Sequence, residues 1–138
     1  MSTPKAMKSL LMGAVLALAA WAGAVGYYAT AQDLTAPTQV VNDYLASLVN
    51  GDTQRLKALI DGPLKLKNRQ LELNPDTYSQ FLTDHYRGVQ TTVEEIVPYG
   101  SQLKARVRFD RGTALDSSVI EFILTPVDGQ WKITEELF

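Results

Sequence analysis

The stretch from Pro37 to Pro63 carries the clearest periodic pattern of apolar positions in the chain. Apolar side chains recur there at the i, i+4, i+8 spacing that places them on one face of a helix, and Asn50-Gly51 ends that helix. The stripe consists of Val40, Val41, Tyr44, Leu45, Leu48 and Val49. Asp52 or Thr53 can cap a second, shorter helix with its own apolar face. Because two short helices joined by a tight turn cannot enclose a core, we expect a sheet beneath them, in the C-terminal half.

Two further elements precede that sheet. Asp61-Gly62-Pro63 is a stop signal, and over residues 64–73 leucines alternate loosely with charged residues, which predicts a half-exposed strand or an irregular arm at an edge. Asn74-Pro75 then has the form of a helix start, with Asn74 as the cap. The apolar stripe of this third helix consists of Tyr78, Phe81, Leu82 and His85.

From Val89 onward the apolar period changes from helical to alternating, which predicts strands. Gly100-Ser101-Gln102 fits a three-residue hairpin loop, and Asp128-Gly129 is a strong signal for a two-residue turn. The first loop gives the inward pairs Tyr99–Leu103, Val97–Ala105 and Val93–Phe109. The second turn gives the pairs Leu124–Ile133, Phe122–Glu135 and Ile120–Leu137. The sequence therefore predicts an α+β fold, with N-terminal helices packed on a curved, mainly antiparallel sheet of four to five strands.

The first 31 residues have the pattern of an export signal. Lys5 and Lys8 precede an uncharged, largely apolar run over residues 10–31, and Ala29-Thr30-Ala31 has the small-x-small form of a signal-peptidase site. The run is also long enough to span a bilayer, so this segment is either a cleaved signal peptide or a retained membrane anchor. Both alternatives place the rest of the chain outside the cytoplasm, in the periplasm or the extracellular space, because the lysines hold the N-terminus inside.

The rest of the chain is interpreted as a linker over residues 32–36 and one domain over residues 37–138. The formal net charge of −2 over 138 residues gives no bias toward polyanions, so we expect no nucleic-acid partner. The chain has no cysteine, which excludes disulfides and thiolate ligands, and its single histidine argues against a zinc site. We therefore expect no metal and no cofactor.

The order of these elements resembles that of the nuclear transport factor 2-like (cystatin-like cone) superfamily, in which a curved sheet wraps around helices and leaves a pocket. The opening PTQVVNDYLASLVNGDTQRLKAL is similar to the start of small bacterial envelope domains of that fold, many of them of unknown function, and the closing DGQWKITEE is similar to their last hairpin. The resemblance covers nearly all of residues 36–138. Many such domains resemble lipoproteins anchored through a cysteine, which this chain lacks. Enzymes of the superfamily, such as ketosteroid isomerase, scytalone dehydratase and limonene epoxide hydrolase, keep their acids and bases on the inner surface.

The predicted register turns two glutamates toward that inner surface. Glu95 is expected to point inward opposite Val107, and Glu135 falls on the inner face in the second hairpin. A carboxylate among apolar neighbours either has a partner or has a raised pKa, as general bases do. Tyr44 and His85 are then expected to converge with them on one candidate ligand pocket. Alternatively, the two glutamates are hydrated or paired with arginines, and Tyr44 only packs its ring in the core. His85 is then a half-exposed residue without a catalytic role. No catalytic residue is assigned.

The outer face of the predicted sheet carries a row of three cations, Lys104, Arg106 and Arg108. Glu94 is expected opposite Arg108, and such a row is typical of a solvated surface with cross-strand pairs. Three apolar side chains also point outward in this register, which indicates a homodimer contact of the kind common in this superfamily. These are Ile96, Val119 and Ile123.

These observations favour an exported, non-catalytic cell-envelope domain that binds a small apolar or amphipathic ligand or a protein partner. One alternative is an isomerase, dehydratase or hydrolase of the same fold, with an inward glutamate as base. Another is a membrane-anchored periplasmic scaffold subunit that resembles the inner-membrane subunits of type IV secretion machines and uses residues 10–31 as its span.

Overall fold

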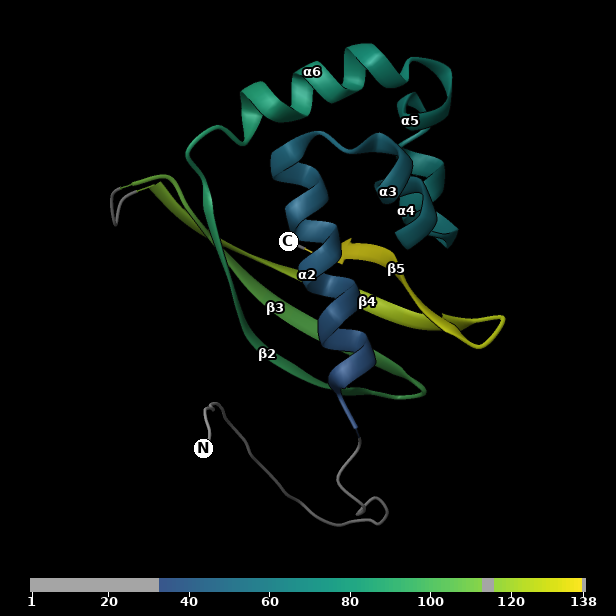
Figure 1. Cartoon of the computed structure of the whole chain (residues 1–138). Coiled ribbons are helices and arrows are strands. Elements are labelled where there is room, and N and C mark those ends of the chain that lie inside the picture. Colours follow the sequence, from purple (N-terminus) through teal and green to yellow (C-terminus); the bar gives the residue numbers. More distant parts are fainter. Residues whose placement is uncertain (1–32, 113–115, 138) are drawn as a thin grey trace. The chain divides into compact units, whose positions relative to one another are not determined.

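The computed structural model describes residues 33–112 and 116–137, and the predicted export signal or anchor lies outside these ranges. Within them, short helices come first and an antiparallel sheet follows, as predicted (Figure 1). The helices are α2 (Thr35–Asn50), α3 (Thr53–Leu59), α4 (Gly62–Lys67), α5 (Gln70–Leu73) and α6 (Pro75–His85). The strands are β2 (Gln90–Tyr99), β3 (Gln102–Asp110), β4 (Ser117–Val127) and β5 (Gln130–Leu137). None of these helices combines the length and the apolar character that crossing a membrane would require.

The first two helices form as the apolar pattern predicted. The side chains that α2 buries include Val41, Tyr44, Leu45 and Leu48. Gly51 ends α2 with a φ of +66°, and the Asp52 side chain caps α3 by accepting a hydrogen bond from the backbone N–H of Arg55 at 3.0 Å. The Arg55 guanidinium also pairs with Asp43 of α2 at 2.5 Å, so the two helices are joined on both sides of the turn.

The segment between α3 and α6 is helical, so the predicted strand or arm over residues 64–73 was wrong. The Asp61 side chain accepts a hydrogen bond from the N–H of Gly62 at 2.8 Å, and Pro63 occupies the first turn of α4. Leu64 and Leu71 are buried seven residues apart, which is two helical turns. The leucines at 66 and 73 are 73% and 62% exposed. The alternation along this segment therefore did not mark a buried face.

The four strands form one antiparallel sheet in the order β2-β3-β4-β5 within the described part of the chain. Figure 1 shows α2 lying across one face of the curved sheet, with α3, α4 and α5 gathered on the side of β5 and α6 running past the end of α2. The buried side chains of the sheet's inner face include Leu103, Ala105, Val107, Phe109, Phe122, Leu124 and Ile133. Along β3 they alternate with more exposed residues, as expected for a strand with one buried face. The core therefore lies between the helices and this face.

The first hairpin has a different register from the predicted one. Tyr99 pairs with Gln102, so the loop has two residues instead of three. A bulge at Glu94 then shifts the phase of β2 again, and Val93 pairs with Val107. All three predicted pairs of this hairpin were therefore wrong, because each single-residue shift exchanges the two faces of a strand.

The second hairpin follows the prediction up to a bulge. Asp128 and Gly129 both have positive φ, as a two-residue type I′ turn requires, and Leu124 pairs with Ile133 as predicted. A bulge then leaves Thr134 outside the ladder. The other two predicted pairs were wrong, because the extra residue shifts the rest of β5 by one position. The structure pairs Phe122 with Glu136 and Glu121 with Leu137.

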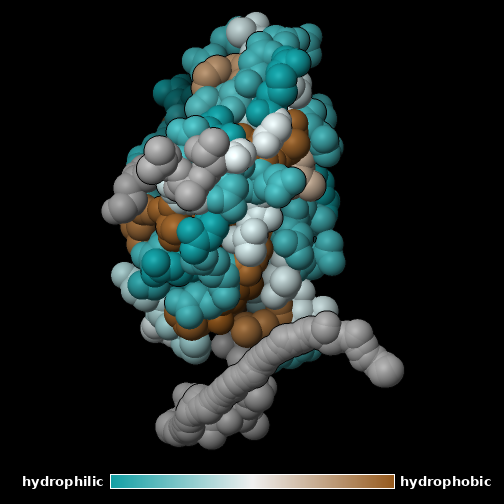
Figure 2. All heavy atoms as spheres, turned by 90° about the vertical axis from the view of Figure 1, so that its left-hand side faces the viewer, coloured by the Kyte–Doolittle hydropathy of each residue, from teal (hydrophilic) through white to brown (hydrophobic). Residues whose placement is uncertain are grey.

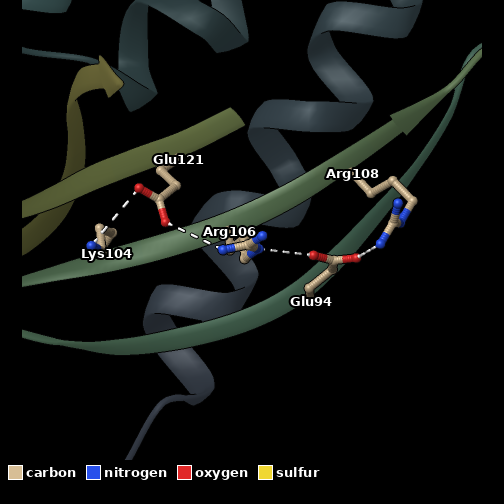
Figure 3. A network of polar contacts seen from close by, with 5 residues as sticks. All are labelled: Glu94, Lys104, Arg106, Arg108 and Glu121. Atoms are coloured by element: carbon tan, nitrogen blue, oxygen red, sulfur yellow. Dashed lines mark hydrogen bonds and ion pairs between the residues drawn. The ribbon is translucent and has the colours of Figure 1, made fainter. Parts of the chain in front are cut away.

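The outer face of the sheet carries the predicted row of cations, which two glutamates join into a chain of ion pairs (Figure 3). Glu94 pairs with Arg106 at 3.2 Å and also with Arg108. Glu121 lies 3.8 Å from both Lys104 and Arg106. Partly exposed pairs of this kind contribute at most about 1 kcal/mol each. The row therefore ties β2, β3 and β4 together across the outer face.

The three apolar residues predicted to form an outward surface do not lie together on one exposed face. Ile96 pairs with Ala105 and so shares the inner face, and Ile123 is only 1% exposed. Val119 pairs with Arg108 on the outer face and is half-buried. The face on the side of β2 is largely hydrophilic, with smaller hydrophobic groups between the polar ones (Figure 2). The homodimer stays a prediction. Of the three residues proposed for it, Val119 and Ile123 lie opposite cations of the outer face as predicted, but Ile123 is buried and Ile96 faces inward.

Candidate functional site

A pocket of about 240 Å³ lies among the helices and the C-terminal end of β5. Its aromatic lining consists of Tyr44, Tyr78, Phe81, His85 and Tyr86. Its aliphatic lining consists of Leu48, Leu56, Ile60, Leu71 and Leu82. Asn68 and Glu136 supply an amide and a carboxylate. Most of the lining residues are thus aromatic or aliphatic, and polar groups of the tyrosines, His85, Asn68 and Glu136 are placed among them.

The exposure of the lining residues distinguishes the base of the pocket from its mouth. Tyr44, Leu71 and Leu82 are buried and form the base. Phe81 is 52% exposed, and His85 beside it is exposed as well, so these two rings lie at the mouth. A ligand would therefore pass the rings of α6 before it reached Tyr44.

The aromatic side chains of the pocket belong to one continuous series of ring contacts. Phe81 stacks between Tyr78 and His85, with ring centroids 5.8 and 5.4 Å apart, because these residues follow one another on the same face of α6. The His85 ring meets Tyr86 edge to face at 4.7 Å. The series continues through Phe109 and Phe122 to Tyr44. The rings hold one another in fixed orientations around the pocket.

Glu136 lines the pocket because of the bulge at Thr134. That bulge pairs Glu136 with Phe122 and leaves Glu135 exposed. Burial raises the pKa of the Glu136 carboxyl above its usual range, and the positive charge of Lys67 partly opposes this rise. Among the residues that the structure describes, none makes a hydrogen bond or an ion pair with this carboxylate.

Three tyrosines lie within electrostatic reach of the same carboxylate. Burial raises the pKa of the Tyr44 hydroxyl well above its usual range, and it raises the pKa values of Tyr78 and Tyr86 as well. The negative charge of Glu136 adds to each of these pKa increases. The hydroxyls are therefore protonated at neutral pH, and the one on Tyr78 donates a hydrogen bond to Oδ1 of Asn68 at 2.9 Å.

Of the four residues predicted to converge on a pocket, Tyr44 and His85 line this one and the two glutamates do not. Glu95 is exposed and lies opposite Arg106, and Glu135 is also exposed. The predicted inward orientation of both glutamates was wrong. The two-residue loop places Glu95 opposite Arg106, and the bulge at Thr134 turns Glu135 outward. A role of Tyr44 and His85 in ligand binding stays a prediction.

His85 is held by an arginine that the sequence interpretation did not connect with it. Arg111 donates a hydrogen bond from Nη1 to the backbone carbonyl of His85 at 2.9 Å, and its Nη2 lies 3.2 Å from Nε2 of the ring. Together with the stacking on Phe81, this contact orients the imidazole at the mouth of the pocket.

Five polar or aromatic residues of the pocket were not predicted as site residues. Four of them are Asn68, which lies in the segment taken for a strand, Tyr86, which follows directly after α6, and Tyr78 and Phe81, which were assigned to the core. The fifth is Glu136, and only the position of the bulge decides between it and its neighbour. Among the described residues no cluster of three potential metal ligands occurs, and the absence of metals and cofactors stays a prediction.

We expect Glu136→Gln to stabilise the protein at neutral pH. The carboxyl has a higher pKa in the folded state than in the unfolded chain, so the folded state binds the proton more tightly. The free energy of unfolding therefore falls as the pH rises from the pKa of the unfolded chain to that of the folded state. Above the folded-state pKa the full penalty for the charged form is present, and glutamine removes it. The gain should shrink toward about pH 4, where the carboxyl is also protonated in the unfolded chain.

Thermal unfolding of the parent and the variant across this pH range measures the effect. The matched control is Glu135→Gln, since Glu135 is the exposed neighbour on the same strand. Equal pH dependence of the two variants would contradict the buried position of Glu136.

Comparisons with known proteins identify the fold. No protein-family model matches the sequence, and no curated protein does either. Among solved structures, a nuclear transport factor 2-like protein of unknown function from Silicibacter pomeroyi is 15% identical, with a TM-score of 0.52 over 75% of this chain and 92% of that one. Similar proteins of unknown function from Methylobacillus flagellatus (20% identity, TM-score 0.53, 76% and 89% covered) and Shewanella baltica (13%, 0.52, 77% and 91%) match as well. The expected fold is confirmed: the chain has the α+β fold of the nuclear transport factor 2-like superfamily.

Proposed function

We propose that this domain binds a small, mainly apolar organic molecule with one polar group, and that it does so outside the cytoplasm. The observation that carries the proposal is the Glu136 carboxylate, which lies in an aromatic pocket without a hydrogen-bond partner among the described residues. A partly buried carboxylate without such a partner costs stability, and a ligand that supplies a donor would remove that cost. The location is supported by the sequence pattern before residue 32 alone.

The dimensions of the pocket agree with a ligand of about one or two rings. An apolar cavity of about 150 Å³ is large enough for benzene, and this pocket measures about 240 Å³. The aliphatic side chains and aromatic rings of the lining accept the apolar body of the ligand, and Glu136 with the tyrosine hydroxyls accepts its polar end.

Acid-base catalysis on such a ligand is a second candidate function. The raised pKa of the Glu136 carboxyl favours it, because a carboxyl with a higher pKa is a better proton acceptor near neutral pH. In that case Glu136, rather than the predicted Glu95 or Glu135, would serve as the base.

Indole, a neutral aromatic molecule of suitable size, tests the binding proposal. In an NMR titration of the purified protein we expect indole to shift the resonances of Tyr44, Leu71 and Leu82 at the base of the pocket. Resonances of the outer sheet face, such as those of Arg106, should stay in place. Native mass spectrometry of protein purified gently from cells would add the mass of any ligand that remains bound.

Two exposed aromatic residues provide a matched pair of variants. Phe81→Ala removes a ring that is 52% exposed at the mouth of the pocket and should weaken indole binding. Tyr99→Ala removes a ring that is 47% exposed beside Lys104 on the sheet and should leave binding unchanged. If indole shifts no resonance at the base, or if both variants bind it equally, the pocket is not a binding site of this kind.

A further inference from the structure

We infer that the ligand of this pocket is an organic ammonium ion, a protonated or quaternary amine with an apolar body. This inference rests on the proposed function, since it names the chemical class of the molecule that the pocket binds. Two features of the pocket carry it, the carboxylate and the aromatic rings.

The carboxylate decides the sign of charge that the pocket accepts. Glu136 is the one acidic residue of the described lining, and none of the described residues pairs with it. An anionic ligand would meet this charge in a partly desolvated site and be repelled, whereas a cation gains both the Coulomb attraction and a charge-assisted hydrogen bond. A protonated amine supplies the donor that the carboxylate lacks.

The aromatic lining favours an ammonium group over other donors. Five of the lining residues are aromatic, and three of them are tyrosines close enough to Glu136 to be affected by its charge. The faces of aromatic rings attract cations, and such rings are the usual partners of quaternary and protonated amines. A neutral alcohol would gain the hydrogen bond to Glu136 but not the attraction to the rings.

Among the described residues, Lys67 and Arg111 are cations near the pocket, and neither forms an ion pair with the carboxylate. Lys67 on α4 attracts Glu136 from a distance, but its side chain is exposed and forms no ion pair with it. Arg111 is engaged by His85, through the bond from Nη1 to the backbone carbonyl and the contact of Nη2 with the ring. Lys67 therefore opposes an ammonium ligand only weakly, and its removal should raise the affinity.

Three probes with the same phenyl body and two-carbon chain separate charge from shape: phenethylamine, phenethyl alcohol and hydrocinnamate. They are positive, neutral and negative at neutral pH, and all can be titrated into the purified protein by NMR. We expect phenethylamine to bind about tenfold more tightly than the alcohol, because one charge-assisted hydrogen bond raises an affinity by about this factor. Hydrocinnamate should bind more weakly than either.

Two substitutions assign the preference to the carboxylate. Glu136→Gln should lower the affinity for phenethylamine about tenfold and leave the affinity for phenethyl alcohol nearly unchanged. Lys67→Met should raise the affinity for the amine alone. The exposed Glu135→Gln is the matched control, and it should change neither affinity.

The outcomes separate the two proposals. If the alcohol binds as tightly as the amine, or if Glu136→Gln leaves amine binding unchanged, the ammonium assignment is overturned while the pocket stands. If indole and all three probes fail to bind, the proposed function fails as well.

Discussion

Phe122→Ala is expected to destabilise the protein by about 3 to 5 kcal/mol, the usual cost of removing a fully buried phenylalanine side chain. Phe122 is 0% exposed, and its ring centroid lies 5.5 Å from that of Tyr44 and 6.4 Å from that of Phe109. Alanine would leave a cavity between α2 and the sheet, because two rings that pack against Phe122 would lose their contact. In a domain of about this size the melting temperature should fall by more than about 10 °C.

Thermal unfolding followed by circular dichroism measures this loss. Phe81→Ala is the control, since it removes the same side chain from a position that is 52% exposed and should cost less than about 1 kcal/mol. Phe122→Leu should recover part of the loss because it refills part of the cavity. Similar losses for the two alanine variants would show that Phe122 is not the centre of the core.

The long periodic helices and the change to alternating strands could be predicted from the sequence. The face of α2 that carries Tyr44 and Leu48 has helical spacing over about three turns, and its end at Gly51 has a specific backbone requirement. The turn at Asp128-Gly129 is equally specific, because both residues adopt positive φ. The stripe of α2 and this turn each predict a single type of local structure.

The segment over residues 64–73 shows why a short apolar pattern is ambiguous. Leucines that alternate with charged residues fit a strand, but Leu64 and Leu71 are also spaced by two helical turns, and these are the two that the fold buries. The sequence did contain a signal for the helix. Asp61 followed by Gly62-Pro63 can start a helix as well as stop one, since an aspartate cap and a proline in the first turn are both favourable there.

The sequence predicted a pocket with an inward glutamate, but not which glutamate it is. An inward glutamate near the C-terminus was expected, and the structure has one, but it is Glu136 and not Glu135. A bulge exchanges the faces of all residues that follow it, and its position is set by packing rather than by a residue pattern. At Thr134 the packing is visible: the side chain is buried, and its Oγ1 lies 2.8 Å from Oγ1 of Thr125. Nothing local in the sequence marks that contact.

Gly51→Ala should cost about 3 kcal/mol or more, because it combines backbone strain with a steric clash. Gly51 has a φ of +66°, which an alanine adopts at a cost of about 1 to 2 kcal/mol. A Cβ at this position would also lie 2.7 Å from the backbone oxygen of Ser79 and 2.7 Å from Cγ2 of Thr83. Ser79 donates a hydrogen bond from Oγ to the carbonyl of Gly51 at 2.7 Å, so α6 packs directly on the turn between α2 and α3.

Gly100→Ala separates the two contributions. Gly100 has a φ of +65° but no atom within 4 Å of the added Cβ, so its variant should show the backbone cost alone. The difference between the two losses of unfolding free energy then measures the contact between the turn and α6. Because α6 carries three of the rings that line the pocket, Gly51→Ala should also weaken indole binding, whereas Gly100→Ala should leave it unchanged. Equal losses of stability would mean that α6 moves away from the turn at no cost, and the rings of the pocket would then not be held in place from this side.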